Sequence, residues 1–322
     1  HMLDPLTHLQ LIGGFVLLFL GGEALVRGSV SLARRLHVSP LLIGATVVAF
    51  GTSMPELVVT LQAALRGSTG IAFGNVIGSN IANLLLIFGL AVAITPVMVS
   101  RQAAVRDGAT LIGATALLAV FISFGTLVAW QGALMLVLLG ALTVASYWHE
   151  RRLVNATGSR HTQDAEERLH LPKPIWLAVA AALLGLAGVS FGAHLMVGAA
   201  TIIARGLGIT ETVIGITVVA VGTSLPELAT TVVAAYRRHA EVAIGNVIGS
   251  SVFNILAILG VVTVVTPLPV PEEIMHIDIW VLAGVTGLVI ATMLSGIRLG
   301  RPFGVLLLLG YAAFAAVQYL AV

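Results

Sequence analysis

Residues 44–96 read GATVVAFGTSMPELVVTLQAALRGSTGIAFGNVIGSNIANLLLIFGLAVAITP, and residues 215–267 read GITVVAVGTSLPELATTVVAAYRRHAEVAIGNVIGSSVFNILAILGVVTVVTP. The two stretches align without a gap at an offset of 171, and 28 of their 53 positions are identical. Chance would leave only a few identities, so the chain carries an internal duplication. Each copy sets a Gly, a Pro and a Glu inside an otherwise apolar run, where a membrane helix should carry none of them.

The composition of the whole chain is that of a membrane protein. Of 322 residues, 58% are hydrophobic and 9% are charged, and the mean hydropathy is +1.05. Soluble domains carry roughly a quarter charged residues. Apolar stretches of about 20 residues recur along the chain, the length that crosses a bilayer as a helix. The pI of 9.4 comes from arginines in loops and does not indicate nucleic-acid binding, and the absence of Cys excludes disulfides and thiolate metal sites.

The pattern predicts an all-α polytopic membrane protein with ten transmembrane helices in two inverted five-helix repeats. The first repeat is expected over 3–148, a cytoplasmic linker over 149–173 and the second repeat over 174–322. Because each half has an odd number of spans, the second half enters the membrane upside down. The predicted spans are 9–31, 39–65, 70–97, 107–124, 127–148, 174–204, 211–236, 241–266, 276–296 and 301–320.

The basic residues predict the orientation, because cytoplasmic loops are rich in Lys and Arg. With ten spans, thirteen basic residues fall on one side and only Arg66 and Arg205 on the other. Both chain termini and the acidic stretch PEE at 271–273 are then expected outside the cytoplasm. The thirteen are Arg34, Arg35, Arg101, Arg106, Arg151, Arg152, Arg160, Arg168, Lys173, Arg237, Arg238, Arg298 and Arg301.

The first duplicated motif, GTS(M/L)PE, lies in mid-span. Pro has no N–H and clashes with the preceding turn, so the helix should break there and free carbonyls near Ala49 and Ala220. Irregular backbone at membrane depth is tolerated only where it is buried in protein or lines a cavity. Glu56 and Glu227 follow the break, and a charge at the bilayer centre costs at least about 2.5 kcal/mol. Paying that cost twice, at equivalent positions, indicates function. The neighbouring hydroxyls are Thr52, Ser53, Thr223 and Ser224.

The second motif, GNVIGS(N/S)xxN, follows about 20 residues later. In a helix its Asn, Ser and Asn lie on one stripe, at positions 75, 79 and 83 and again at 246, 250 and 254. Small and polar residues in membrane helices often serve only packing and interhelical hydrogen bonds. Together with two carboxylates, however, they form an all-oxygen set without His or thiolate. Such sets suit Ca²⁺, and smaller subsets suit Na⁺.

The paired GTSxPE and GNxxGSN motifs closely resemble the two α-repeats of the calcium/cation antiporter superfamily, in its sodium/calcium exchanger branch and short prokaryotic form. The resemblance covers essentially the whole chain. It implies the ten-helix inverted-repeat fold in a prokaryotic plasma membrane, with both termini outside. It also implies sliding of the first and sixth spans past the other eight, and one central cation site with several flanking sites.

The resemblance also implies a role for individual residues. The central carboxylates fall on Glu56 and Glu227, and Asn83 and Asn254 complete the central ring. Asn254 matches potassium-independent exchangers, since the potassium-dependent branch has Asp at this type of position. Gly78 and Gly249 stand where the proton-coupled branch has a carboxylate. The implied flanking ligands are the carbonyls of Ala49 and Ala220 and the hydroxyls of Thr52, Ser53, Ser79, Thr223, Ser224 and Ser250.

The expected function is therefore exchange of Na⁺ for Ca²⁺ by alternating access, electrogenic at three Na⁺ per Ca²⁺ and K⁺-independent. H⁺/Ca²⁺ antiport stays open as the alternative, because two close carboxylates can raise each other's proton affinity. A membrane-embedded hydrolase is disfavoured by the lack of a His base in the motifs. We expect no enzymatic activity and no cofactor. The expected partners are Ca²⁺, Na⁺ and the lipid bilayer, with no nucleic acid and no evident protein partner.

Overall fold

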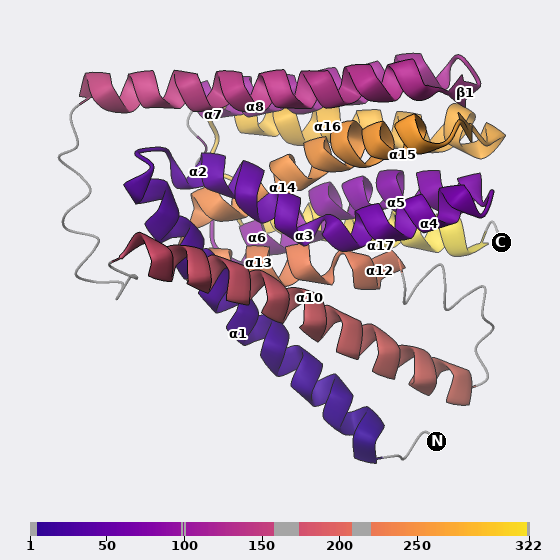
Figure 1. Cartoon of the computed structure of the whole chain (residues 1–322), viewed down its shortest axis with the longest axis horizontal. Helices are drawn as coiled ribbons and strands as arrows, with labels where there is room; N and C mark the ends of the chain where they lie inside the picture. Colours follow the sequence, from indigo (N-terminus) through magenta and orange to yellow (C-terminus); the bar gives the residue numbers. More distant parts are fainter. Residues whose placement is uncertain (1–4, 98, 100, 158–173, 208–219, 321–322) are drawn as a thin grey trace.

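The computed structural model describes residues 5–97, 99, 101–157, 174–207 and 220–320. Most of these residues are helical (Figure 1), and the chain also contains short π-helical segments, which are named η in the text. The elements are α1 Pro5–Arg35, α2 Pro40–Ile43, η1 Gly44–Val48, α3 Ala49–Thr52, α4 Met54–Leu65, α5 Thr69–Ala82, η2 Asn83–Ile87, α6 Phe88–Ile94, α7 Arg101–Ile122, β1 Thr126–Leu127, α8 Ala129–Thr157, α10 Ile175–Gly206, α12 Ala220–Thr223, α13 Leu225–Tyr236, α14 Ala240–Phe253, η4 Asn254–Ile258, α15 Leu259–Val265, β2 Leu268–Pro269, η5 Ile274–Asp278, α16 Ile279–Leu294 and α17 Arg301–Leu320.

Eight helices in the described part of the chain are long and apolar enough to cross a membrane. A ninth candidate is a bent pair, in which Pro40–Thr52 and Met54–Leu65 meet at 45°. These nine match nine of the predicted spans. The remaining prediction, 211–236, begins in residues outside the described ranges and continues as α12 and α13. The all-helical polytopic fold is thus confirmed, and the tenth span stays a prediction.

Two helix boundaries differ from the expected ones. Helix α7 begins at Arg101, before the predicted start at 107, and α8 continues to Thr157, past the predicted end at 148. The sequence HERRLVNAT over 149–157 contains neither Gly nor Pro, so nothing in it ends a helix where the apolar run ends. The first part of the expected linker is therefore helical, and the rest of it, 158–173, lies outside the described residues.

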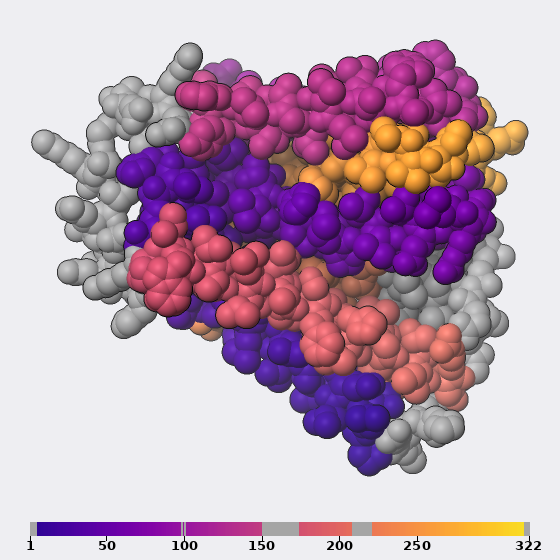
Figure 2. All heavy atoms as spheres, viewed as in Figure 1, coloured from indigo at the N-terminus to yellow at the C-terminus, as the bar shows by residue number. Residues whose placement is uncertain are grey.

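Helices α1 and α10 pack against each other along their length and project from the rest of the molecule as a separate arm (Figures 1 and 2). Glycines make the contact close. A Cβ on Gly21 would lie 2.6 Å from the backbone nitrogen of Val189, and one on Gly185 would lie 2.3 Å from that of Leu25. Small residues at such crossings let two membrane helices approach backbone to backbone.

The centre of the molecule is formed by the duplicated motifs. The stretch Ala240–Val265 is the most buried of the candidate spans, and Thr69–Ile94 is the next. Helix α14 packs closely on α2 and η1, where a Cβ on Gly245 would lie 2.2 Å from the carbonyl oxygen of Leu41. This motif glycine therefore admits a neighbouring helix, whereas a Cβ on Gly74 or Gly78 of the first copy would meet nothing within 4 Å.

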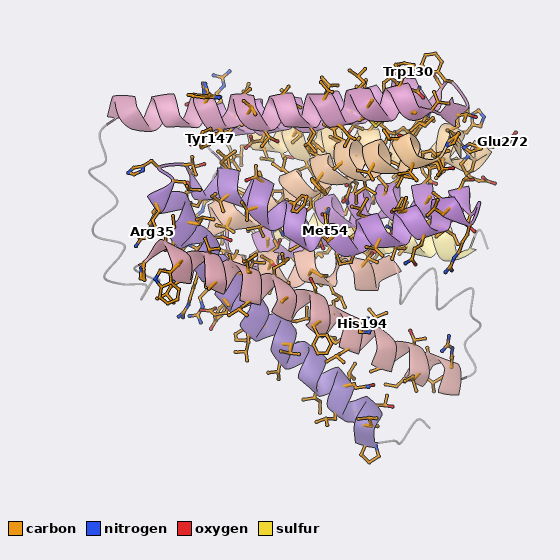
Figure 3. The ribbon with its side chains drawn as sticks, viewed as in Figure 1. Arg35, Met54, Trp130, Tyr147, His194 and Glu272 are labelled. Carbon is orange, nitrogen blue, oxygen red and sulfur yellow. The ribbon has the colours of Figure 1, made fainter. Side chains whose placement is uncertain are left out.

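The two ends of the helical bundle differ in the residues they carry. Arg35 and Tyr147 lie toward one end, whereas Trp130 and Glu272 lie toward the other (Figure 3). At the second end, β1 and β2 form an antiparallel pair in which Leu127 is opposite Leu268. Met54 lies between the two ends, at the break within the bent span (Figure 3). The duplicated motif therefore sits at mid-depth.

Candidate cation-binding site

The helix break in each GTSxPE motif occurs at its serine. Ser53 has φ −85° and ψ 7°, and Ser224 has φ −87° and ψ 5°, so both leave the helical region in the same way. Helices α4 and α13 then restart with Pro in the first turn. Glu56 and Glu227 lie in that first turn as well, where the helix dipole favours a negative charge.

The motif glycines make room for α10. A Cβ on Gly51 would lie 2.6 Å from the side chain of Leu186, and one on Gly222 would meet the side chain of Val197 still more closely. Glycine in mid-span also weakens a helix, because it has the largest conformational freedom to lose. The structure adds a second reason, since both halves of the site are covered by side chains of one helix.

The two carboxylates are held by hydroxyls from the opposite half of the chain. Ser53 donates from Oγ to Oε1 of Glu227 at 3.0 Å, and Ser224 donates from Oγ to Oε1 of Glu56 at 3.1 Å. Both glutamates are 1% exposed. The two bonds are reciprocal under the sequence offset of 171, as a pseudo-two-fold relation between the halves requires.

Two asparagines of the second motif are anchored in the same reciprocal way. Asn75 donates from Nδ2 to Thr60 Oγ1 at 2.9 Å, and Asn246 donates from Nδ2 to Thr231 Oγ1 at 2.9 Å. Each amide oxygen then accepts from a hydroxyl of the other half, at 3.4 Å from Thr52 or Thr223. The two anchoring threonines are not among the predicted site residues, although their identity in both copies was a usable signal.

The outer asparagines begin π-helical segments. Asn83 opens η2 and Asn254 opens η4, at equivalent positions in the two copies. Single π-turns inside α-helices are frequently found at functional sites. Asn254 donates from Nδ2 to Oδ1 of Asn80 at 3.2 Å, and this partner was missed by the sequence analysis because position 80 is Asn in one copy and Ser in the other.

The structure gathers the predicted ligands unevenly. Ser79 lies 3.3 Å from Ser224, and Thr52 donates to the Ala49 carbonyl at 3.4 Å. That carbonyl also accepts the Ser53 N–H at 3.0 Å, so it is not freed by the break as expected, although an oxygen with two lone pairs retains acceptor capacity. Ala220 is the first residue of α12, one turn before Ser224.

Several buried oxygens lack a hydrogen-bond donor among the described residues. They are Glu56 Oε2, Glu227 Oε2, Asn83 Oδ1, Asn254 Oδ1 and Ser250 Oγ. Leaving such groups unpaired is costly, and buried charges are ordinarily paired or bound to a metal ion. Within the described ranges no three of His, Cys, Asp and Glu converge, so the formal charge rests on the two glutamates alone. A set of oxygen ligands with two negative charges suits a hard cation whose charge those two carboxylates can neutralise.

The model of a known family matches residues 7–148 and 177–320, and its description is "Sodium/calcium exchanger protein". The chain belongs to this sodium/calcium exchanger family. It is an integral membrane protein of a family of transporters. The match leaves residues 149–176 between its two parts, the region of the expected linker.

Full-length relatives support the assignment. The chain is 33% identical over 351 residues to the sodium/calcium exchanger MaX1 of Methanosarcina acetivorans, covering 97% of this chain and 98% of that one. It is 36% identical over 316 residues to CaxA of Alkalimonas amylolytica, covering 95% and 96%. A solved structure of the sodium-calcium exchanger NCX_Mj is 31% identical, with a TM-score of 0.83, covering 97% of this chain and 98% of that one. The resemblance to the exchanger branch in its short prokaryotic form is thereby confirmed.

Proposed function

We propose that the exchanger carries Na⁺ in one direction and Ca²⁺ in the other, by alternating access to the site around Glu56 and Glu227. The observation that carries the proposal is the reciprocal pair of serine–carboxylate bonds, which leaves one oxygen of each glutamate without a donor. The relatives named sodium/calcium exchangers support the choice of ions.

The central cation is held in this proposal by Glu56, Glu227, Asn83 and Asn254. Their side chains are 1% exposed and supply four oxygens without a hydrogen-bond donor in the described structure. The flanking Na⁺ ligands are the carbonyls of Ala49 and Ala220 and the hydroxyls of Thr52, Ser53, Ser79, Thr223, Ser224 and Ser250. The serine bonds to the carboxylates hold flanking ligands within hydrogen-bond distance of central ones, so the flanking sites lie directly beside the central site.

The charge balance of the site couples the movement of Ca²⁺ to that of Na⁺. With Asn254 neutral, the ionised site carries −2, which one Ca²⁺ neutralises. Two or three Na⁺ can use the same oxygens, because each needs fewer ligands and less charge. An empty site leaves two unpaired carboxylates in a low dielectric, which is strongly unfavourable and resists the conformational change. Three Na⁺ per Ca²⁺ would move one net charge, worth about 2.3 kcal/mol per 100 mV.

The architecture proposed with this mechanism is ten spans in two inverted repeats, 3–148 and 174–322, joined by a cytoplasmic linker over 149–173. Two observations support it: the family match divides at the same place, and α1 begins toward the same end of the bundle at which α17 ends (Figure 1). Both termini then lie outside the cytoplasm, in a prokaryotic plasma membrane. Alternating access is assigned to sliding of α1 and α10 as one unit over the other helices.

Reconstitution into proteoliposomes tests the proposal against its alternative. Gradients of Na⁺, K⁺ and H⁺ are imposed one at a time, and uptake of ⁴⁵Ca²⁺ is measured. We expect uptake with a Na⁺ gradient alone, unchanged by K⁺. Uptake driven by a pH gradient without Na⁺ would instead establish H⁺/Ca²⁺ antiport, and uptake without any counter-ion gradient would indicate a channel.

A further inference from the structure

A hollow of about 950 Å³ lies between α7 and α8, and none of its lining residues belongs to the duplicated motifs. Helix α7 packs mainly against α16, and α8 packs mainly against α15, so the two helices have different neighbours. The hollow is bridged by Gln102 and His149, whose Nε2 atoms are 3.3 Å apart. Its position is on the outer surface of the bundle, at the start of one helix and near the end of the other.

The lining of the hollow divides into a basic part and an apolar part. Arg101 and Arg106 stand within the first two turns of α7 and lie ~7.5 Å apart along its axis. Val105 from α7 and Leu142 and Ala145 from α8 form the apolar part. Half of the Val105 surface is exposed to the surroundings among the described residues.

The charge of the hollow is positive but partly compensated. Arg106 donates from Nε and Nη2 to the carboxylate of the adjacent Asp107, at 2.6 and 3.2 Å. Arg101 is exposed at the first residue of α7. The two arginines and Asp107 together carry a formal charge of +1. This is the end of the bundle at which the predicted topology collects the basic residues, at the interface between hydrocarbon and cytoplasm.

We propose that this hollow binds the phosphate headgroup of an anionic glycerophospholipid of the surrounding bilayer. The phosphate lies against Arg101 and Arg106, which supply guanidinium donors matched to phosphate oxygens. The acyl carbons follow Val105, Leu142 and Ala145 into the hydrocarbon. Basic pockets between transmembrane helices on the cytoplasmic side are general binding places for anionic lipid headgroups. The proposal concerns a site separate from the cation site and does not depend on the identity of the transported ions.

Thermal unfolding of the purified protein in neutral detergent tests the proposal. Phosphatidylglycerol and phosphatidylcholine with the same acyl chains are added separately, and sn-glycerol 3-phosphate is added as a headgroup without chains. We expect phosphatidylglycerol to raise the apparent Tm by several degrees more than phosphatidylcholine, and the free phosphate ester to give no shift. Equal shifts with both lipids would overturn the proposal, and a full shift with the free ester would assign the hollow to a soluble phosphate.

A matched pair of double variants separates lipid binding from a general loss of charge. Arg101→Gln with Arg106→Gln should remove most of the additional shift. The matched control is Arg298→Gln with Arg301→Gln, which removes the same charge on the same predicted side at exposed positions outside the hollow. A shift that falls equally in the control pair, or that is unchanged in Arg101→Gln with Arg106→Gln, would contradict the assignment.

Discussion

Asn254 donates from its amide nitrogen to the amide oxygen of Asn80 at 3.2 Å, and this bond breaks the two-fold pattern of the site. The counterpart of Asn80 is Ser251, which donates instead to the Val247 carbonyl within its own helix. The counterpart of Asn254 is Asn83, whose amide atoms both lack a hydrogen-bond partner among the described residues. Of the two central asparagines, Asn254 therefore has its amide orientation fixed, with Oδ1 left as the available ligand.

Replacing Asn80 by Ser, the residue of the other copy, should weaken Ca²⁺ binding. The Asn254 amide would then rotate freely, and one hydrogen bond is worth about 0.5–1.5 kcal/mol. We expect the half-saturating Ca²⁺ concentration for exchange to rise about 2- to 10-fold, with little change in maximal rate. The measurement is ⁴⁵Ca²⁺ uptake as a function of Ca²⁺ concentration. Ser251→Ala is the matched control and should behave like the wild type; an unchanged half-saturation in Asn80→Ser would remove Asn80 from the site.

Removing either of the serine hydroxyls that donate to the carboxylates should lower the apparent affinity for Na⁺. Ser53→Ala and Ser224→Ala each delete a donor to a buried carboxylate and a proposed Na⁺ ligand. The half-saturating Na⁺ concentration should rise in both, and more in Ser224→Ala, because Ser224 also lies 3.3 Å from Ser79. Na⁺ dependence of ⁴⁵Ca²⁺ efflux measures this. Ser123→Ala, at an exposed hydroxyl outside the motifs, is the control. Wild-type Na⁺ dependence in both site variants would refute the flanking assignment.

The turns that follow α4 and α13 stand at equivalent positions of the duplication, and they differ in the residue that adopts a left-handed conformation. Gly67 has φ +73°, and Arg238, its counterpart, has φ +61°. Both turns close with the same bond from the third residue past the helix, Ser68 N–H to the Ala63 carbonyl and His239 N–H to the Ala234 carbonyl. A non-glycine residue in the left-handed conformation destabilises the folded state by about 1–2 kcal/mol. Replacing it by glycine removes this strain, but glycine also raises the entropy of the unfolded chain, which offsets part of the gain.

Arg238→Gly should therefore raise the free energy of unfolding by about 0.5–1 kcal/mol. Thermal unfolding in detergent would report a higher apparent Tm. Arg238→Ala removes the same side chain but keeps the strained backbone, so it should show no such gain. A gain of equal size in both variants would attribute the effect to charge rather than to backbone conformation.

An ion-pair cluster joins the α1–α10 arm to the rest of the molecule. Glu23 on α1 pairs with Arg27 at 2.6 Å and with Arg237, which follows α13, at 2.7 Å. Arg27 lies one helical turn from Glu23, at the i, i+4 spacing, whereas Arg237 is 214 residues away in sequence. Both arginine side chains are about 40% exposed, so solvent screens the interaction.

A double-mutant cycle with Glu23→Gln and Arg237→Gln should accordingly give a coupling of about 0.2–1 kcal/mol in unfolding stability. The same cycle with Glu23→Gln and Arg35→Gln, an arginine on the same helix outside this cluster, should give a coupling near zero. Equal couplings in the two cycles would mean that long-range charge, rather than the contact, stabilises the arm.

The sequence alone predicted the helical fold, the central glutamates and the mid-span breaks. These features depend on composition, apolar run length and a duplicated Pro–Glu pair, all of which can be read directly along the sequence. The exact ends of α7 and α8 were not predictable, because helices continue past the hydrocarbon wherever no Gly or Pro stops them. The prediction of a freed Ala49 carbonyl was wrong, since the ladder remains hydrogen-bonded up to Ser53.

Contacts between the two halves could not be read from the sequence in the same way. The reciprocal bonds of Ser53 and Ser224 depend on how the halves face each other, which the duplication suggests but does not specify. Asn80 was overlooked because comparing the copies selects identical positions, and its role arises from their difference. The closeness of Leu186 to Gly51 is likewise a property of the assembled helices.

The central claim is that Glu56 and Glu227 together carry the transported cations. Its most direct test is Na⁺-gradient-driven ⁴⁵Ca²⁺ uptake into proteoliposomes by Glu56→Gln and Glu227→Gln, each checked for the wild-type elution profile in size-exclusion chromatography. Each substitution removes one of the site's two formal charges while keeping its shape. The account predicts that both variants fold and that neither exchanges Ca²⁺ above the protein-free background. Exchange at the wild-type rate in both variants would contradict it.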